Sequence, residues 1–234
     1  MTHYASKPGL FPMKGGCPCG LVRFQLELPP LIVHCCHCTA CQIQQGSAFA
    51  VNAVIESSYL TLLPPLSQPC IASGDPAAPP TPTGASIGVA ALFNATVSPN
   101  LRGFSQAEGN QEEETQKPVE PYYTTTPSAS TLGQQVARCP GCHVGLWNYY
   151  AGAGQHEAYV LVGTLDRAME LDPDVHLYTR TRRSFITISD GKPQFEGYYD
   201  DRARFFRPDC KERVEALNPK VEEFKEARTE AMKT

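Results

Sequence analysis

Seven cysteines in three spaced groups constrain this 234-residue chain more than any other feature of its sequence. They are Cys17 and Cys19 in CPCG, Cys36, Cys38 and Cys41 in HCCHCTAC, and Cys139 and Cys142 in CPGC. The chain's ten cysteines fall below the density of a disulfide scaffold, roughly 8–10% in a short secreted chain. In a reducing compartment, such clusters indicate metal binding or catalysis.

The first and last groups are two cysteine pairs that can share one ion. Cys17 and Cys19 are two residues apart, and Cys139 and Cys142 have the spacing of a zinc knuckle. Two such pairs can close a tetrahedron of four thiolates, each about 2.3 Å from zinc, which predicts a saturated structural site. The alternative is a pair of redox dithiols, but a redox C-x-x-C motif should open a long helix. The residues after CPGC favour turns and strands instead.

The middle group offers three thiols at offsets of two and three, with no further cysteine pair to complete it. Zinc with three protein ligands keeps a position for water or substrate, which is typical of a catalytic site. Cys35, His34 or His37 can also fill that position and make a second inert site, and the spacing leaves this choice open. Cys70 and Cys210, isolated in the sequence, are predicted to be free thiols.

Composition limits the function classes. With 41% hydrophobic residues, the chain is long enough to bury a core without disulfides. A net charge of -4 argues against holding nucleic acid or anionic lipid through a global electrostatic field. No window approaches the roughly 18 apolar residues of a membrane span, and the first residues lack a signal-peptide core. We therefore expect a cytoplasmic protein with no nucleic-acid or membrane partner, whose oligomeric state the sequence does not indicate.

Short alternating runs predict a mainly β fold. Runs of strand character occupy residues 22–28, 47–55, 59–63, 157–166 and 175–179, and residues 184–199 are expected to form a hairpin that turns at Asp190 and Gly191. The first run, VRFQLEL, alternates apolar and polar side chains, which is the period of a half-buried strand.

The predicted organisation is one zinc-binding domain at residues 15–200, between an N-terminal tail (1–14) and a charged, helical extension (201–234). A Pro/Gly/Ser-rich insertion is expected at about 64–135, because 11 of the 21 prolines fall between Pro64 and Pro127. One strand is expected inside it, at residues 86–97. In the extension, Pro219 is predicted to break a helix or begin one.

Five segments resemble a known family, in the same order. They are GGCPCGLVRFQL, CHCTACQIQQGSAF, RCPGCHVGLW and VGTLDRAMELDPDVHLY with ITISDGKPQFEG, and they resemble the glutathione-dependent formaldehyde-activating enzymes, a family that includes centromere protein V. The resemblance covers roughly residues 15–63 and 136–200. Three features depart from the family: His143 replaces a usual glycine, Cys35 is an extra thiol, and the insertion lengthens the chain between the metal groups.

The resemblance implies a β-tent of small antiparallel sheets and two zinc ions per chain. It assigns the structural ion to Cys17, Cys19, Cys139 and Cys142, and the catalytic ion to Cys36, Cys38 and Cys41. It also implies carbon–sulfur lyase chemistry with glutathione as the thiol partner and co-substrate. We expect a small-molecule thiol to dock at or near the three-cysteine zinc, where its adduct with a small electrophile forms or breaks.

Two alternatives belong to other functional classes. One is an isomerase or lyase of another metabolite on the same scaffold, and the other is a non-catalytic, zinc-stabilised binding module that uses the insertion as its contact surface. Candidates to hold a peptide carboxylate are Arg180, Arg182, Arg183, Arg202 and Arg204, although exposed strand positions explain them as well. Asp166 and His176 are candidates to line or brace the cleft, without catalytic roles.

Overall fold

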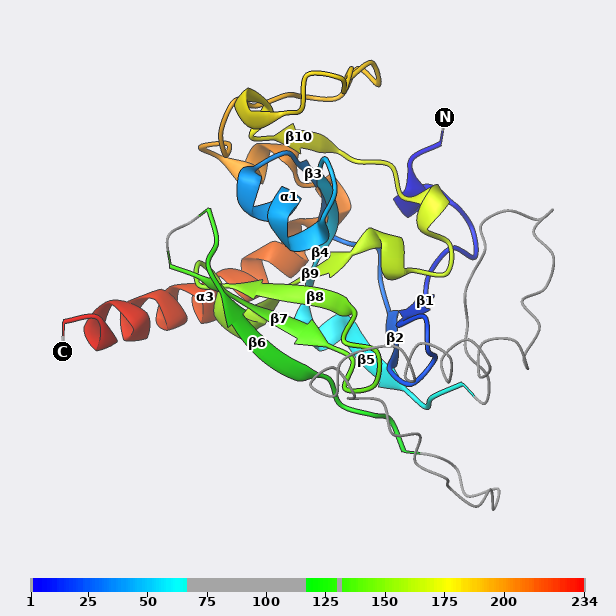
Figure 1. Ribbon diagram of the computed structural model, residues 1–234. Coiled ribbons are helices and arrows are strands. Elements are labelled where there is room, and N and C mark those ends of the chain that lie inside the picture. The colour runs from blue at the N-terminus through cyan, green and yellow to red at the C-terminus, as the bar shows by residue number, and fades with distance from the viewer. Residues whose placement is uncertain (1, 67–116, 130–131, 234) are drawn as a thin grey trace, which may run out of the picture.

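The computed structural model describes residues 2–66, 117–129 and 132–233, and this part of the chain is mainly β, as predicted (Figure 1). A three-stranded sheet has the order β1-β2-β5, and a seven-stranded sheet has the order β10-β3-β4-β9-β8-β7-β6. The small sheet comprises β1 (Met13–Gly16), β2 (Arg23–Leu26) and β5 (Leu60–Leu63). The large sheet comprises β3 (Ile32–Cys36), β4 (Ala50–Glu56), β6 (Tyr122–Thr126), β7 (Gln134–Arg138), β8 (Gly145–Tyr150), β9 (Glu157–Leu161) and β10 (Val175–Leu177). The described α-helices are α1 (Thr39–Gln45) and α3 (Lys211–Ala231).

The alternation that predicted β2 places its apolar residues in the main core. Phe24 and Leu26 are fully buried, and the ring of Phe24 meets the ring of Trp147 from β8 edge to face, with centroids 5.5 Å apart. Such aromatic pairs stabilise a core beyond the area they bury. The contact joins the small sheet to the large one.

The large sheet departs from the expected antiparallel pattern at one edge. β10 pairs with β3 in parallel, with Val175 opposite His34, His176 opposite Cys35 and Leu177 opposite Cys36. A parallel pair needs a long connection, so this register depends on contacts far apart in the sequence. It places three residues of β10 beside the thiol-rich end of β3.

The prediction of a hairpin at residues 184–199 is wrong. Phe185 is 73% exposed, and the structure assigns no strand to this segment, apart from an isolated parallel bridge between His176 and Gln194. The carbonyl of Pro193 accepts a hydrogen bond from the backbone N–H of His176, and the N–H of Phe195 donates to the carbonyl of His176. The second half of the segment therefore pairs with β10 instead of folding back on the first half.

The prediction that Pro219 breaks a helix or begins one is also wrong. Pro219 lies inside the 21-residue helix α3. The residue whose carbonyl loses its helical partner, Glu215, is exposed, so water can satisfy that carbonyl.

None of the described helices is long and apolar enough to cross a membrane.

Two regions bear on the predicted insertion. Residues 86–97, where a strand was expected, lie outside the described residues. Strand β6 falls within the range 64–135 and pairs along its whole length with β7, in the register Tyr122 to Arg138 through Thr126 to Gln134. The end of that range is therefore part of the large sheet, and the domain boundaries themselves stay a prediction.

Helix α3 is held to the sheets by a buried ion pair and by close packing. The guanidinium of Arg213 donates to both carboxylate oxygens of Glu56, at 2.9 and 2.5 Å, and lies 5.2 Å from the ring centroid of Tyr59. Further along the helix, the ring of Phe224 lies against Gly154, where a Cβ atom would come within 2.6 Å of the ring. Gly154 also has φ +58°, which glycine adopts without strain.

We expect Arg213→Ala to lower the free energy of unfolding by about 3 kcal/mol, because it leaves the buried carboxylate of Glu56 without its partner. Urea denaturation of the zinc-loaded protein measures this loss. The control is Lys211→Ala on the same helix, whose side chain is 78% exposed and pairs with Glu215 at 3.9 Å. It should cost less than about 0.5 kcal/mol, and equal losses for both variants would contradict the ion-pair account.

Candidate metal centre

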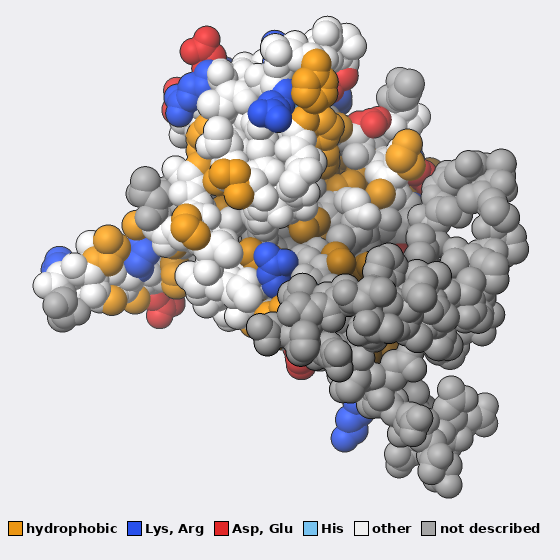
Figure 2. All heavy atoms as spheres, viewed as in Figure 1, with side chains coloured by type: hydrophobic (Ala, Val, Ile, Leu, Met, Phe, Trp, Pro, Cys, Tyr) orange, Lys and Arg blue, Asp and Glu red, His pale blue; other side chains and the backbone are white. Residues whose placement is uncertain are grey.

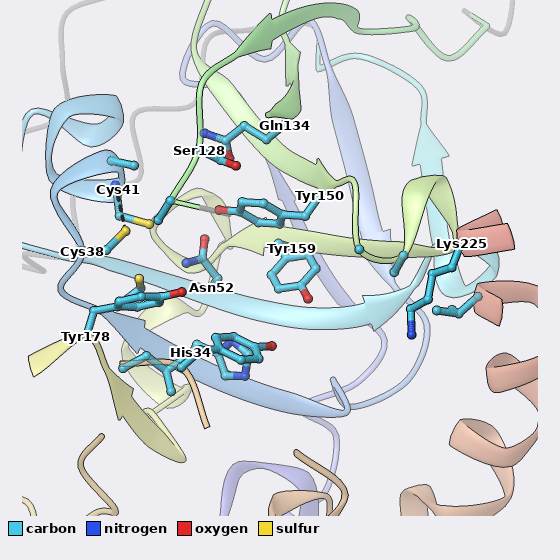
Figure 3. A pocket seen from close by; sticks show the side chains of 18 residues that line it. His34, Cys38, Cys41, Asn52, Ser128, Gln134, Tyr150, Tyr159, Tyr178 and Lys225 are labelled. Carbon is cyan, nitrogen blue, oxygen red and sulfur yellow. Dashed lines mark hydrogen bonds between the residues drawn. The ribbon is translucent and has the colours of Figure 1, made fainter. Parts of the chain in front are cut away.

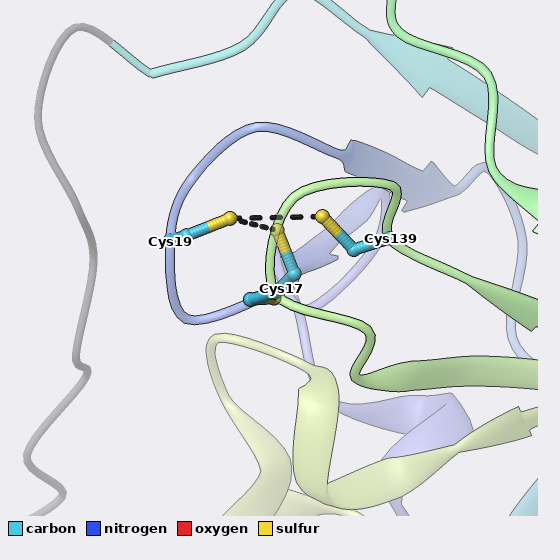
Figure 4. Close-up of side chains that lie close together, drawn as sticks. Cys17, Cys19 and Cys139 are labelled. Atoms are coloured by element: carbon cyan, nitrogen blue, oxygen red, sulfur yellow. Dashed lines mark hydrogen bonds between the residues drawn. The ribbon is translucent and has the colours of Figure 1, made fainter. Parts of the chain in front are cut away.

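Four cysteines from two loops meet at one point, as Figure 4 shows for three of them. Cys17 and Cys19 lie in the turn between β1 and β2, and Cys139 and Cys142 lie in the turn between β7 and β8. The Sγ atoms of Cys17 and Cys19 are 3.3 Å apart, those of Cys19 and Cys139 are 3.6 Å apart, and all four lie within 4.8 Å of one another. Four thiolates on one zinc ion lie about 3.8 Å apart, so this quartet fits the ion.

Backbone N–H groups prepare the quartet for negative charge. The N–H of Val22 donates to Sγ of Cys17, and the N–H of Gly141 donates to Sγ of Cys139, both at 3.3 Å. Burial raises the pKa of the Cys139 thiol, but hydrogen bonds from the N–H groups of Cys142 and Gly141 and from the thiols of Cys17 and Cys19 together leave the pKa lowered. CPGC connects two strands instead of opening a helix, which disfavours the redox alternative.

The position of His143 explains why a glycine suits this turn. His143 has φ +61°, in the left-handed region that glycine adopts without steric cost. Its Nδ1 atom lies 2.9 Å from the hydroxyl of Tyr122 on β6. The substitution noted in the sequence therefore keeps the turn and adds a contact to a neighbouring strand, and the four thiols still converge.

The second cluster consists of Cys36, Cys38 and Cys41, called the trio below, whose Sγ atoms lie within 4.8 Å of one another. Cys36 ends β3, Cys38 is the N-cap of α1, and Cys41 lies in the first turn of that helix. The backbone N–H of Cys41 donates to Sγ of Cys38 at 3.3 Å, which is the usual hydrogen bond of an N-cap side chain. All three thiols are buried.

The trio is poised to hold negative charge. Hydrogen bonds from the Cys36 and Cys41 thiols lower the pKa of the Cys38 thiol to about 3, and backbone N–H groups at the start of α1 add to this effect. The pKa of Cys36 is raised, first because its thiol donates to Cys38 and Cys41. One thiolate shared among three sulfurs at a helix N-terminus is a suitable ligand set for a soft or borderline cation.

The trio opens onto a cavity of about 430 Å³. Figure 3 shows Cys38 and Cys41 at one end of this cavity, Lys225 of α3 at the other end, and tyrosine rings between them. The tyrosines that line the cavity are Tyr150, Tyr159, Tyr178 and Tyr198. The quartet lines neither of the two described cavities, so the trio differs from it in access to a ligand.

Two of the tyrosines bear directly on the trio. The Tyr150 hydroxyl hydrogen-bonds to Cys41, and burial, followed by the negative charge of the trio, raises the pKa of Tyr150 well above its ordinary value. Burial and the charges of Cys36 and Cys38 also raise the pKa of Tyr178. Tyr178 has φ +57°, a conformation that costs a bulky residue roughly 1–2 kcal/mol. Such strain often marks a functional position.

None of the three residues considered as a fourth ligand belongs to the cluster formed by the trio. Cys35 and His37 group with His176, on the opposite face of β3, because side chains alternate along a strand. His34 does line the cavity, and its Nε2 atom lies 2.6 Å from the hydroxyl of Tyr199. Cys210 is a buried free thiol, as predicted, and Cys70 lies outside the described residues.

The charged candidates are distributed differently from the prediction. Asp166 accepts two hydrogen bonds from the buried guanidinium of Arg23, at 3.0 and 2.5 Å, and so braces β2. Of the arginines considered as carboxylate ligands, four are not among the described residues that line the cavity, namely Arg180, Arg182, Arg183 and Arg204. The side chain of Arg202 lies outside what the structure describes. Lys225 lines it instead. No sequence pattern indicated this lysine, because its position beside the cavity depends on how α3 packs.

Comparison with known proteins covers part of the chain. No curated protein matches it. A family model matches residues 12–71, a segment that contains Cys17, Cys19 and the trio and ends before the CPGC pair. That model is the glutathione-dependent formaldehyde-activating enzyme family, so the resemblance seen in the sequence is confirmed over this segment.

Proposed function

We propose that this protein is a zinc-dependent carbon–sulfur lyase that makes or breaks the adduct of a thiol, such as glutathione, with a small electrophile. The observation that carries the proposal is the cavity of about 430 Å³ that ends at the trio. The quartet supplies all four ligands that a tetrahedral zinc ion needs, whereas the trio supplies three sulfurs and adjoins a space for a further ligand. The family match over residues 12–71 supports glutathione and formaldehyde chemistry.

The ligand set fits the proposed cofactor. Zinc held by three thiolates would carry a net charge near -1 and would keep a docking thiol deprotonated. We assign the structural zinc to the quartet and the catalytic zinc to the trio, which makes two ions per chain for these sites. The thiols need a reducing compartment, which supports a cytoplasmic location.

Residues at the two ends of the cavity would have different roles in the reaction. In the condensing direction, a thiolate sulfur forms a bond to the carbonyl carbon of an aldehyde, and the π bond of the carbonyl breaks. The carbonyl oxygen takes up a proton from water, which replaces the proton that the thiol released. Tyr178 is protonated at neutral pH, as tyrosine ordinarily is, and its raised pKa disfavours loss of this proton further. Its hydroxyl can therefore donate a hydrogen bond to that oxygen. Lys225, at the far end, is placed to bind a carboxylate of the thiol. The reverse direction breaks the same carbon–sulfur bond.

The distribution of charge on the surface also disfavours a binding module whose partner is nucleic acid. On the face shown in Figure 2, Lys and Arg side chains are scattered, and some lie beside acidic ones. The described part of this face therefore has no continuous basic surface of the kind that attracts a polyanion. A cavity beside the trio, in contrast, suits a small molecule.

Isothermal titration of the zinc-loaded protein with glutathione tests the proposal. We expect binding of one glutathione per chain, and we expect Lys225→Ala to weaken it roughly 5–10-fold, because an exposed ion pair contributes about 1 kcal/mol. Absence of glutathione binding, without release of zinc, would remove the proposal.

The helix provides a matched control for Lys225. Lys225 pairs with Glu222 at 2.7 Å, and Lys233 pairs with Glu230 at 2.8 Å with the same spacing of three residues. Only Lys225 is among the lining residues of the cavity. Lys233→Ala should therefore leave the affinity for glutathione unchanged, and an equal loss in both variants would show that Lys225 acts only through general charge.

A further inference from the structure

A third cluster lies behind the trio, on the opposite face of β3. The Sγ atom of Cys35 is 3.5 Å from Nε2 of His37, and that nitrogen is 3.1 Å from Nδ1 of His176. All three side chains are buried. Two imidazoles and a thiol, with their ligand atoms within 4.8 Å of one another, form a compact donor set that belongs to neither the quartet nor the trio.

We propose that Cys35, His37 and His176 bind a third metal ion, of the zinc class. Zinc binds histidine nitrogen at about 2.0–2.1 Å and cysteine sulfur at about 2.3 Å. Tetrahedral angles then separate a sulfur from a nitrogen by about 3.5 Å and two nitrogens by about 3.3 Å. The observed distances of 3.5 and 3.1 Å fit this arrangement.

The hydrogen bonds around the cluster orient the ligands. Nε2 of His176 lies 2.8 Å from a carboxylate oxygen of Asp190, so the proton of His176 is held on Nε2 and the lone pair of Nδ1 faces the other two ligands. A carboxylate behind a metal-binding histidine is the usual outer partner of such a ligand. Without an ion, Nε2 of His37 donates its proton to that lone pair. Metal binding would move this proton to Nδ1 of His37, which has no hydrogen-bond partner among the described residues.

The backbone fixes the positions of the ligands before any ion binds. Cys35 and His176 are direct partners in the parallel pairing of β3 with β10. The carbonyl of His37 accepts hydrogen bonds from Gln42 at 2.7 Å and from Thr181 at 3.0 Å, and its N–H donates to the carbonyl of Leu177 at 2.9 Å. Little chain entropy remains to be lost on binding, which favours a preformed site.

Charge also balances at this site. One thiolate and two neutral imidazoles leave a divalent ion with a charge of about +1, and the carboxylate of Asp190 beside His176 compensates it. Three protein ligands would leave the fourth position of the ion to a water molecule. None of the three ligands lines either described cavity, so no substrate cavity among these two adjoins the site. We assign it a structural role: it ties the edge strand β10, and with it the neighbouring Tyr178, to β3.

Zinc content per chain tests this site, measured by mass spectrometry after dialysis. We expect Cys35→Ala to lose one zinc relative to the wild type. The matched control is Cys210→Ala, which removes another buried thiol and should lose none. Retention of the full zinc content by a folded Cys35→Ala protein would overturn the proposal.

Two further variants keep the test independent of folding and of the trio. Asp190→Asn leaves every ligand in place at a side chain that is 38% exposed, and it should weaken one zinc by roughly 10–100-fold in a chelator competition. Unchanged affinity in this variant would count against the site. The double variant Cys35→Ala, Cys38→Ser should lose two zinc ions. If it loses the same single ion as each parent, then Cys35 belongs to the trio and the third site is wrong.

Discussion

Cys38→Ser is expected to lose one zinc ion per chain and to lower kcat/KM for the addition of formaldehyde to glutathione by roughly 10³-fold, while the protein stays folded. Cys38 is the sulfur of the trio on which negative charge concentrates, because the thiols of Cys36 and Cys41 lower its pKa to about 3. Removing it leaves two ligands for the ion. Loss of the several kcal/mol that a metal contributes to the transition state corresponds to such a rate change, since 1.36 kcal/mol is tenfold.

The fold should tolerate this change because serine can replace the structural role of Cys38. Cys38 is the N-cap of α1, and its sulfur accepts the backbone N–H of Cys41. Serine is among the preferred N-cap residues and accepts the same hydrogen bond through its hydroxyl. Helix α1 should therefore begin at the same residue.

Zinc analysis, far-UV circular dichroism and an NMR exchange assay of the thiol adduct measure the three expected outcomes. Cys210→Ser is the matched control, because Cys210 is a buried thiol packed against α3, away from the trio. It should keep the zinc content and the rate. A Cys38→Ser protein with wild-type turnover would contradict the role of the trio, and loss of the fold would contradict the assignment of this ion as catalytic only.

Local patterns predicted five of the ten described strands, namely β2, β4, β5, β9 and β10. The alternation of VRFQLEL predicted β2, where Phe24 and Leu26 are buried. The apolar run at residues 47–55 overlaps β4, and the run at 157–166 contains β9; these two strands pair in the centre of the large sheet. The hairpin prediction failed because Pro193 and Phe195 pair with β10, a contact that no local pattern contains.

The cysteine spacing predicted which sulfurs meet, but not what lies around them. The quartet joins residues more than 100 positions apart, and the structure brings its two pairs together. Lys225 reaches the cavity only because the Arg213–Glu56 ion pair and Phe224 position α3. The contact of Cys35 with His176 depends on the parallel register of β10, which no local pattern contains. The alternation of side chains along HCCHC does place Cys35 and His37 on the face opposite to Cys36 and Cys38.

Cys139→Ser is expected to lose the folded state together with zinc, in contrast to Cys38→Ser, which is expected to stay folded. Cys139 is fully buried and joins the turn between β7 and β8 to Cys19 in the turn between β1 and β2, at 3.6 Å between sulfurs. The quartet therefore links the small sheet to the large one. Structural zinc contributes about 10–16 kcal/mol of binding free energy in small peptides, which is comparable with the 5–15 kcal/mol that holds a whole domain folded.

Thermal denaturation followed by circular dichroism, with and without a zinc chelator, distinguishes the two kinds of site. The wild type should unfold in a single transition that the chelator moves to a much lower temperature, whereas Cys139→Ser should show little folded signal and no response to the chelator. Cys36→Ser is the matched comparison, because Cys36 is also a buried cysteine in a metal-binding group and its loss should leave the transition in place. If Cys139→Ser melted like Cys36→Ser, the two sheets would be held together by the Phe24–Trp147 contact and the surrounding core without help from the quartet.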